Sequence, residues 1–168
     1  MATPALPPCG IYRTTLNVSG IEAGRLVYFH NHGEPGPGLY LPESWAANRA
    51  KFSERGNTVP SDFDPKGLFA LPSEGFYRVT KEFYCCDKQC MKFETNTFVQ
   101  LGFNANGTAL VFVPMLGPTG ITLPDRGVVV DDVMLKHLQP LKLAEGKPTG
   151  GSAEPEINIT LPRGFVVH

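Results

Sequence analysis

The sequence lacks any apolar run long enough to cross a bilayer, and it carries no excess of charge of either sign. Charged residues make up only 18% of the chain, and the formal net charge is −1. Proteins that bind nucleic acid or an anionic membrane through charge usually present a basic surface. We therefore expect neither nucleic acid nor a membrane among the partners of this chain.

A secretory signal is also lacking, because residues 1–8 have neither a basic start nor an apolar core. We expect a cytoplasmic protein on this ground. Disulfides are rare in the cytoplasm, where thiols are kept reduced. The four cysteines, Cys9, Cys85, Cys86 and Cys90, are therefore expected to be free thiols or metal ligands.

Catalytic motifs are the third absence. The sequence contains no Gly-x-Ser-x-Gly nucleophile elbow and no Gly-x4-Gly-Lys phosphate loop. The four histidines, His30, His32, His137 and His168, have no recognisable spacing to a nucleophile. We therefore assign no catalytic residues from the sequence.

Glycine and proline, by contrast, are abundant, with 18 and 16 copies. They separate apolar runs of strand length along the whole chain, which is typical of many short strands joined by tight turns. The clearest example is the Asn104–Gly107 turn between the apolar runs 97–103 and 108–113, because an Asn-Gly pair favours a hairpin. With 42% hydrophobic residues to fill a core, the sequence predicts a mainly β protein.

One hexapeptide occurs twice, as Gly10-Ile-Tyr-Arg-Thr-Thr15 and as Gly75-Phe-Tyr-Arg-Val-Thr80. Each copy is followed by a valine and a proline at the same mutual spacing. These anchors are Val27 and Pro42 in the first copy and Val99 and Pro114 in the second. We interpret the match as an internal duplication of a unit of about 50 residues.

The fold class predicted from this pattern is two duplicated small units of an SH3-like or similar β-barrel type. The first unit is expected at residues 1–60 and the second at 75–143, with a connector at 61–74. Residues 144–168 are expected to form a linker and a C-terminal extended segment. The alternation of apolar and polar residues over 157–161 predicts that this segment forms a strand.

A short helix is expected at about residues 43–54, after the first hairpin. The segment is rich in good helix formers, and its spacing places Trp45 and Phe52 on one helical face. We expect both aromatic side chains to pack inward.

The sequence offers two candidate sets of metal ligands. His30 and His32 lie two residues apart, so on a strand they point to one face, and Glu34 follows them. The alternative is that they are polar residues at the end of a strand.

The second and denser set is Cys85, Cys86 and Cys90. Zinc prefers thiolates and takes four ligands in a structural site, so Cys9 or the two histidines would have to complete the set. Adjacent cysteines on a strand point to opposite faces, so Cys85 and Cys86 share a metal only if a turn intervenes. The alternative is a set of inert thiols that act as small apolar side chains.

These observations favour a non-enzymatic protein-binding or assembly subunit. Its partner would be another protein or further copies of the chain, bound through exposed strand edges and the C-terminal segment. The alternative is a metal-dependent enzyme or a zinc-stabilised module that uses His30, His32 and Glu34 or the Cys85–Cys90 cluster, with zinc as the cofactor.

Overall fold

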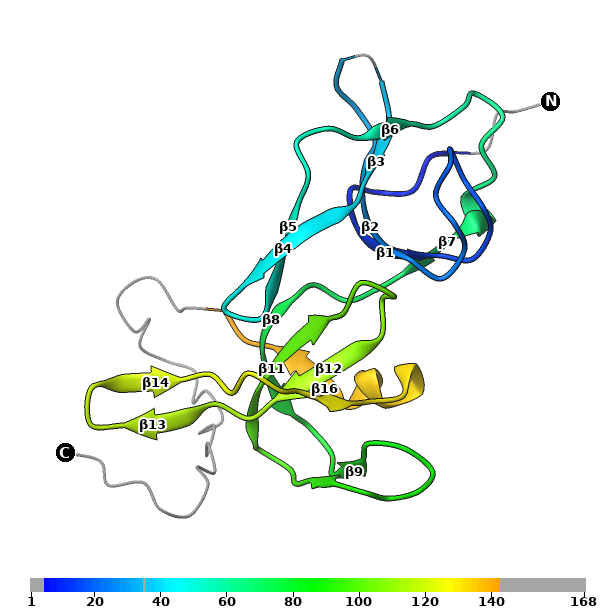
Figure 1. Cartoon of the computed structure of the whole chain (residues 1–168). Coiled ribbons are helices and arrows are strands. Elements are labelled where there is room, and N and C mark those ends of the chain that lie inside the picture. Colours follow the sequence, from blue (N-terminus) through cyan, green and yellow to red (C-terminus); the bar gives the residue numbers. More distant parts are fainter. Residues whose placement is uncertain (1–4, 35, 143–168) are drawn as a thin grey trace, which may run out of the picture. The chain divides into compact units, whose positions relative to one another are not determined.

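A computed structural model describes residues 5–34 and 36–142 of the chain. These residues are mainly β: they form short strands in five sheets together with two 3-10 helices (Figure 1). The chain divides into two compact units. Unit 1 contains residues 1–74 and 102–110, and unit 2 contains 75–101 and the residues from 111 onward. Within the described residues, no helix is long and apolar enough to span a membrane.

Unit 1 is built on a five-stranded sheet with the order β6-β3-β2-β1-β7. Its strands are β1 (Gly10–Thr14), β2 (Leu26–His30), β3 (Gly38–Tyr40), β6 (Asn57–Thr58) and β7 (Leu68–Ala70). A 3-10 helix, η1 (Pro65–Gly67), directly precedes β7. Asp64 begins this helix, and its carboxylate accepts a hydrogen bond from the Lys66 backbone at 2.9 Å.

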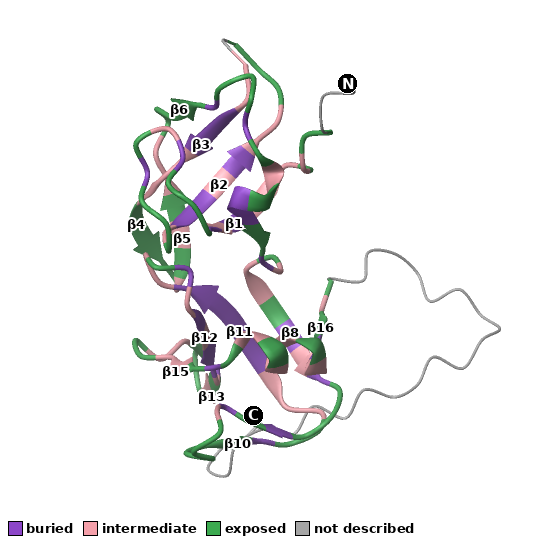
Figure 2. Ribbon diagram, turned by 90° about the vertical axis from the view of Figure 1, so that its right-hand side faces the viewer, coloured by how far each residue is buried: buried purple, intermediate pink, exposed green. Residues whose placement is uncertain are grey.

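The strand β1 alternates between buried and half-buried residues, as expected for a strand with one covered face. On β1, Tyr12 and Thr14 are buried, while Ile11 and Arg13 are only half-buried. The Tyr12 ring packs edge-on against Phe29, with 6.2 Å between the ring centroids. The core cluster of unit 1 consists of Tyr12, Val18, Ile21, Val27, Phe29, Leu39, Val59, Phe63 and Leu68. Figure 2 shows the buried residues along β2 and β3 in purple.

A second five-stranded sheet has the order β15-β12-β11-β8-β16. Its strands are β8 (Gly75–Val79), β11 (Phe98–Phe103), β12 (Ala109–Phe112), β15 (Val128–Val129) and β16 (Leu138–Pro140). The predicted hairpin at Asn104–Gly107 is confirmed, since it joins β11 to β12 and Gly107 has a φ of 70°. Residues Asp132–His137 form η2, directly before β16.

The two five-stranded sheets have the same strand order and the same register. In both, the first strand lies between the second and the last. Tyr12 pairs with Val27 and Ala70, and Tyr77 pairs with Val99 and Pro140. The two Tyr-Arg pairs therefore occupy the same place in the two sheets.

Each arginine that follows these tyrosines contacts its cross-strand neighbour on the last strand of its sheet. The Arg13 guanidinium lies over the Phe69 ring, 4.8 Å from its centroid. The Arg78 guanidinium donates to Gln139 Oε1 at 2.7 Å. The guanidinium at this position thus helps to hold the last strand against the first.

Three further hairpins extend from these sheets. They are β4–β5 (Pro42–Ala46 and Arg49–Phe52), β9–β10 (Phe83–Tyr84 and Lys92–Phe93) and β13–β14 (Met115–Gly117 and Gly120–Thr122). β4–β5 follows the third strand of the first sheet, and β13–β14 follows the third strand of the second.

The predicted helix at 43–54 is wrong, because these residues form the β4–β5 hairpin. Ala47 and Asn48 have φ values of 49° and 63°, the two consecutive positive angles of a tight hairpin turn. Strand pairing across this turn therefore overrides the helix propensity of the segment. Trp45 is also not a core residue: it is 40% exposed, and its indole N–H donates to the Phe103 carbonyl at 2.9 Å.

The predicted closed barrels are likewise not formed, since over residues 5–34 and 36–142 the strands make open sheets. Residues 61–74, predicted as a connector, contain η1 and β7, and β7 pairs with β1. The predicted linker and C-terminal strand at 144–168 lie outside the described residues.

The Gly107 turn allows a test of close packing within unit 1. Gly107 has a positive φ, and a Cβ at this position would lie 3.1 Å from Cβ and Cγ of Arg13. We expect Gly107→Ala to lower the free energy of unfolding by about 1–3 kcal/mol, measured by urea denaturation.

Gly24→Ala is the matched control, because Gly24 has a φ of +80° but no atom lies within 4 Å of the place that a Cβ would occupy. Both variants carry the same backbone strain, so the larger loss at Gly107 measures the crowding against Arg13. Equal losses in the two variants would show that the Arg13 side chain moves aside freely.

Candidate metal centres

The candidate ligands fall into two separate groups. Cys9, His30 and His32 come together in unit 1, and Cys85, Cys86 and Cys90 come together in unit 2. In each group the ligand atoms all lie within 4.8 Å of one another. Cys9 therefore lies with the histidines and not with the other three cysteines.

The pairing of β1 with β2 brings Cys9 to the histidines. Gly10 pairs with Phe29, so the next residues outward along the two strands, Cys9 and His30, lie opposite each other. His32 follows two residues beyond the end of β2, and the chain then turns at Gly33, which has a φ of 113°. The His30 and His32 rings lie next to each other with centroids 4.0 Å apart.

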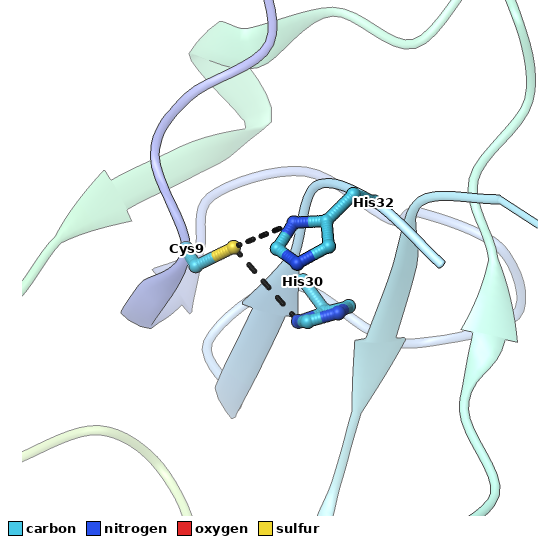
Figure 3. A group of neighbouring side chains, drawn as sticks. All are labelled: Cys9, His30 and His32. Atoms are coloured by element: carbon cyan, nitrogen blue, oxygen red, sulfur yellow. Dashed lines mark hydrogen bonds between the residues drawn. The ribbon is translucent and has the colours of Figure 1, made fainter.

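The Cys9 sulfur faces both imidazoles (Figure 3). It lies 3.8 Å from His30 Nδ1 and 3.6 Å from His32 Nδ1. Cys9 and His30 are half-buried, whereas His32 is exposed. The group is therefore more accessible to solvent at His32 than at Cys9 and His30.

Asn31, which the sequence analysis did not single out, holds this group together. Its side-chain oxygen lies 3.2 Å from the Cys9 sulfur and 2.9 Å from His32 Nδ1. Its backbone N–H donates to the Cys9 sulfur at 3.3 Å, and its side-chain amide donates to the Pro7 carbonyl at 3.2 Å. The only sequence signal for this role is its position between the two histidines.

The segment before Cys9 has a second anchor. The Tyr12 hydroxyl donates to the Pro8 carbonyl at 2.7 Å. Burial raises the pKa of Tyr12, and the nearby Cys9 raises it further, so this hydroxyl stays protonated as a donor. Glu34, the third ligand suggested by the sequence, is exposed and lies outside the group.

The second group lies in the loop between β9 and β10. The Gln89 N–H donates to the Cys86 carbonyl at 2.9 Å, and Gln89 has a φ of 53°, so the chain reverses direction here. This is the turn that the adjacent residues Cys85 and Cys86 need in order to share one metal ion. Cys85 is buried, Cys86 is half-buried and Cys90 is exposed.

The three sulfur atoms are close but not bonded. Cys85 and Cys86 are 3.6 Å apart, and Cys86 and Cys90 are 4.0 Å apart, against about 2.05 Å in a disulfide. The Met91 N–H donates to the Cys85 sulfur at 3.3 Å. Two backbone bonds, from Cys85 N–H to the Met91 carbonyl and from Asp131 N–H to the Cys85 carbonyl, fix Cys85 in place.

These contacts give neighbouring thiols different acidities. The Cys85 thiol donates a hydrogen bond to the Cys86 sulfur, and this bond lowers the pKa of Cys86 most. Hydrogen bonds from the backbone N–H groups of Lys88 and Cys90 lower it further. The hydrogen bond with Cys86 and the negative charge there raise the pKa of Cys90. As the pH rises, Cys86 therefore loses its proton before Cys90 does.

Cys86 also lines a depression of about 330 Å³ in unit 2. His137 also lines this depression, and its ring is stacked on Phe83 with 5.7 Å between the ring centroids. Burial, with smaller effects of Lys136 and Lys81, lowers the pKa of His137. This histidine is not one of the grouped ligands.

No protein-family model, curated protein or solved structure matches this chain.

The thiol acidities predict an order of alkylation. Because the pKa of Cys86 is lowered and that of Cys90 is raised, Cys86 keeps its reactive thiolate to lower pH. Brief iodoacetamide pulses over a pH series, followed by peptide mass spectrometry, should modify Cys86 at lower pH than Cys90, although Cys90 is more exposed.

The control is the chain unfolded in urea, in which the two thiols should react with the same pH dependence. If Cys90 reacts first at every pH in the folded protein, exposure and not acidity governs this loop.

Proposed function

We propose that this chain is a duplicated, SH3-like β protein that binds a zinc ion through Cys9, His30 and His32. The observation that carries the proposal is the spacing of the three ligand atoms. Zn–S bonds of about 2.3 Å and Zn–N bonds of about 2.0–2.1 Å place S and N about 3.5–3.6 Å apart across a tetrahedral angle. The Cys9 sulfur is 3.6 and 3.8 Å from the two Nδ1 atoms.

The type of ligand favours zinc. One thiolate with two imidazoles suits Zn²⁺, whereas Mg²⁺ and Ca²⁺ require oxygen ligands. Three protein ligands leave a fourth position for water or another small ligand. That position faces solvent beside the exposed His32.

The surroundings of the group fit a site that is organised in advance. The Asn31 N–H donates to the Cys9 sulfur, which would bind a metal as the thiolate. The Asn31 side-chain oxygen holds the Cys9 sulfur and His32 Nδ1 close together in the absence of a metal. The same amide oxygen competes with the metal for His32 Nδ1, and this weakens binding.

Metal binding is expected to cross-link two strands of unit 1. Cys9 precedes β1 and His30 ends β2, so a shared metal would cross-link the open ends of two paired strands. A ligand that binds only the folded state adds its binding free energy to the stability of that state. The proposed function of the ion is therefore to stabilise unit 1.

The duplication is supported by the two sheets. Across each sheet, the strands lie in the order fourth, third, second, first and last, counted along the chain. A 3-10 helix directly precedes the last strand in each. Their Tyr-Arg pairs have the same register. A five-stranded meander in which the last strand returns beside the first is the arrangement that an SH3-like unit requires.

The test of the zinc proposal is a titration of the full chain with Zn²⁺, followed by NMR of ¹⁵N-labelled histidine side chains. We expect one equivalent to shift the imidazole signals of His30 and His32 and to raise the melting temperature. His137 is the internal reference and should not shift. Loss of a hydrogen-bonding partner of a ligand typically costs 10–100-fold in affinity, so Cys9→Ser or His32→Ala should cost at least about 100-fold.

Cys90→Ser is the matched thiol control, and it should leave the His30 and His32 shifts unchanged. Zinc-dependent shifts that survive Cys9→Ser would exclude the proposed ligand set. A titration that leaves both histidines unshifted would exclude zinc from this group.

A second candidate function, the protein-binding or assembly subunit, is supported by exposed apolar side chains in unit 2. Met115 and Ile121 on the β13–β14 hairpin are 46% and 56% exposed, and Val129 on the edge strand β15 is 55% exposed. Apolar groups on a projecting hairpin and on an unpaired edge favour association. We propose a second copy of this chain as the partner.

Sedimentation velocity over a concentration series tests this candidate. We expect a reversible dimer that Ile121→Asp shifts to monomer. Val133→Asp is the control, because Val133 is 66% exposed but lies on η2. A wild-type protein that stays monomeric at every concentration, or a dimer that is weakened equally by both variants, would count against assembly through this hairpin.

A further inference from the structure

We infer that Cys85, Cys86 and Cys90 form a second and chemically different metal site, which binds one copper(I) ion through three sulfur atoms. The inference is independent of the zinc proposal, because the two ligand sets share no residue and belong to different units.

The ligand set selects the ion. The group contains sulfur ligands only, and soft thiolates select soft cations such as Cu(I). Zinc bound here would keep an open fourth position, as in the unit 1 group, because within residues 5–34 and 36–142 no fourth cysteine, histidine or carboxylate joins the three sulfur atoms. Copper(I), with a filled d shell and a single charge, is satisfied by three thiolates.

The spacing of the sulfur atoms agrees with their binding of one shared ion. Metal–sulfur bonds of about 2.3 Å place sulfur atoms about 4.0 Å apart around a trigonal ion and about 3.8 Å apart around a tetrahedral one. The distances are 3.6 Å between Cys85 and Cys86 and 4.0 Å between Cys86 and Cys90. Only small side-chain rotations are needed to bring the three sulfur atoms around one ion.

The loop supplies the other groups that a thiolate site needs. The Met91 N–H donates to the Cys85 sulfur at 3.3 Å, which offsets part of the negative charge of a buried thiolate. Cys85 is 2% exposed and is held by backbone bonds to Met91 and Asp131. One ligand is thus fixed in the protein before the ion arrives.

The other side of the group is open. Cys90 is exposed, and Cys86 lines the depression of about 330 Å³. An ion can therefore enter and leave without unfolding of the loop. We infer a site that exchanges copper with thiol ligands in solution, in contrast to an enclosed structural site.

The test is an anaerobic titration of the reduced full chain with Cu(I), with bathocuproine disulfonate as a coloured competitor. We expect one Cu(I) per chain to move from the chelator to the protein, with sulfur-to-copper charge-transfer absorption. Cys86→Ser and Cys90→Ser should each lower the affinity at least about 100-fold, by the same reasoning as for a lost zinc ligand. Because Cys86 is half-buried and Cys90 is exposed, both variants are expected to fold, and circular dichroism checks that they do.

Cys9→Ser is the matched control, and it should bind Cu(I) as the wild type does. Copper transfer that disappears in Cys9→Ser but persists in Cys86→Ser would overturn the inference, because it would place the ion in unit 1. A wild-type chain that takes no Cu(I) from the chelator would also overturn it. A parallel titration with Zn²⁺ that alkylation of Cys86 and Cys90 abolishes, without any copper transfer, would assign the cluster to zinc instead. These copper results do not measure zinc binding by Cys9, His30 and His32, so failure here leaves the zinc proposal standing.

Discussion

The backbone hydrogen bonding of β1 and β8 is the interaction on which the rest of each five-stranded sheet depends, because each of these strands pairs along both edges. β1 pairs with β2 on one side and with β7 on the other, and β8 pairs in the same way with β11 and β16. The last strand of each unit must therefore return beside the first before either sheet is complete. Tyr12 and Val79, buried on these strands, then have neighbours on both sides.

The metal ligands of unit 1 follow from the same pairing. Cys9 directly precedes β1, and the register of β1 with β2 places it opposite His30. If the two sheets are aligned by register, Gly102 and Asn104 stand where the histidines do, so the second sheet carries no such set. Unit 2 has its thiols elsewhere, in the β9–β10 loop. The two sheets thus share their strand order and the register of their first strands, and they differ in the side chains that lie around them.

The sequence predicted those features that depend on neighbours in the chain, and it missed those that depend on pairing. The Asn104–Gly107 turn has a local signal in its Asn-Gly pair, and the hairpin is confirmed. The helix at 43–54 was wrong because helix propensity is weak beside the cross-strand pairing of Trp45 with Ala50. The approach of Cys9 to His30 could not be predicted, since it requires the register of two strands separated by a long loop. The role of Asn31 was hidden for the same reason.

The tip of the β11–β12 hairpin, residues 102–110, belongs to unit 1, and this has a consequence for how the chain is made. The Leu26 N–H donates to the Ala105 carbonyl, and the Arg13 guanidinium donates to the Gly107 carbonyl. During synthesis, residues 1–74 leave the ribosome well before Ala105 and Gly107, whose carbonyls accept these bonds. The amino-terminal half must therefore wait, incomplete, until much of the second half has been synthesised, and no single cut in the chain yields two self-sufficient domains.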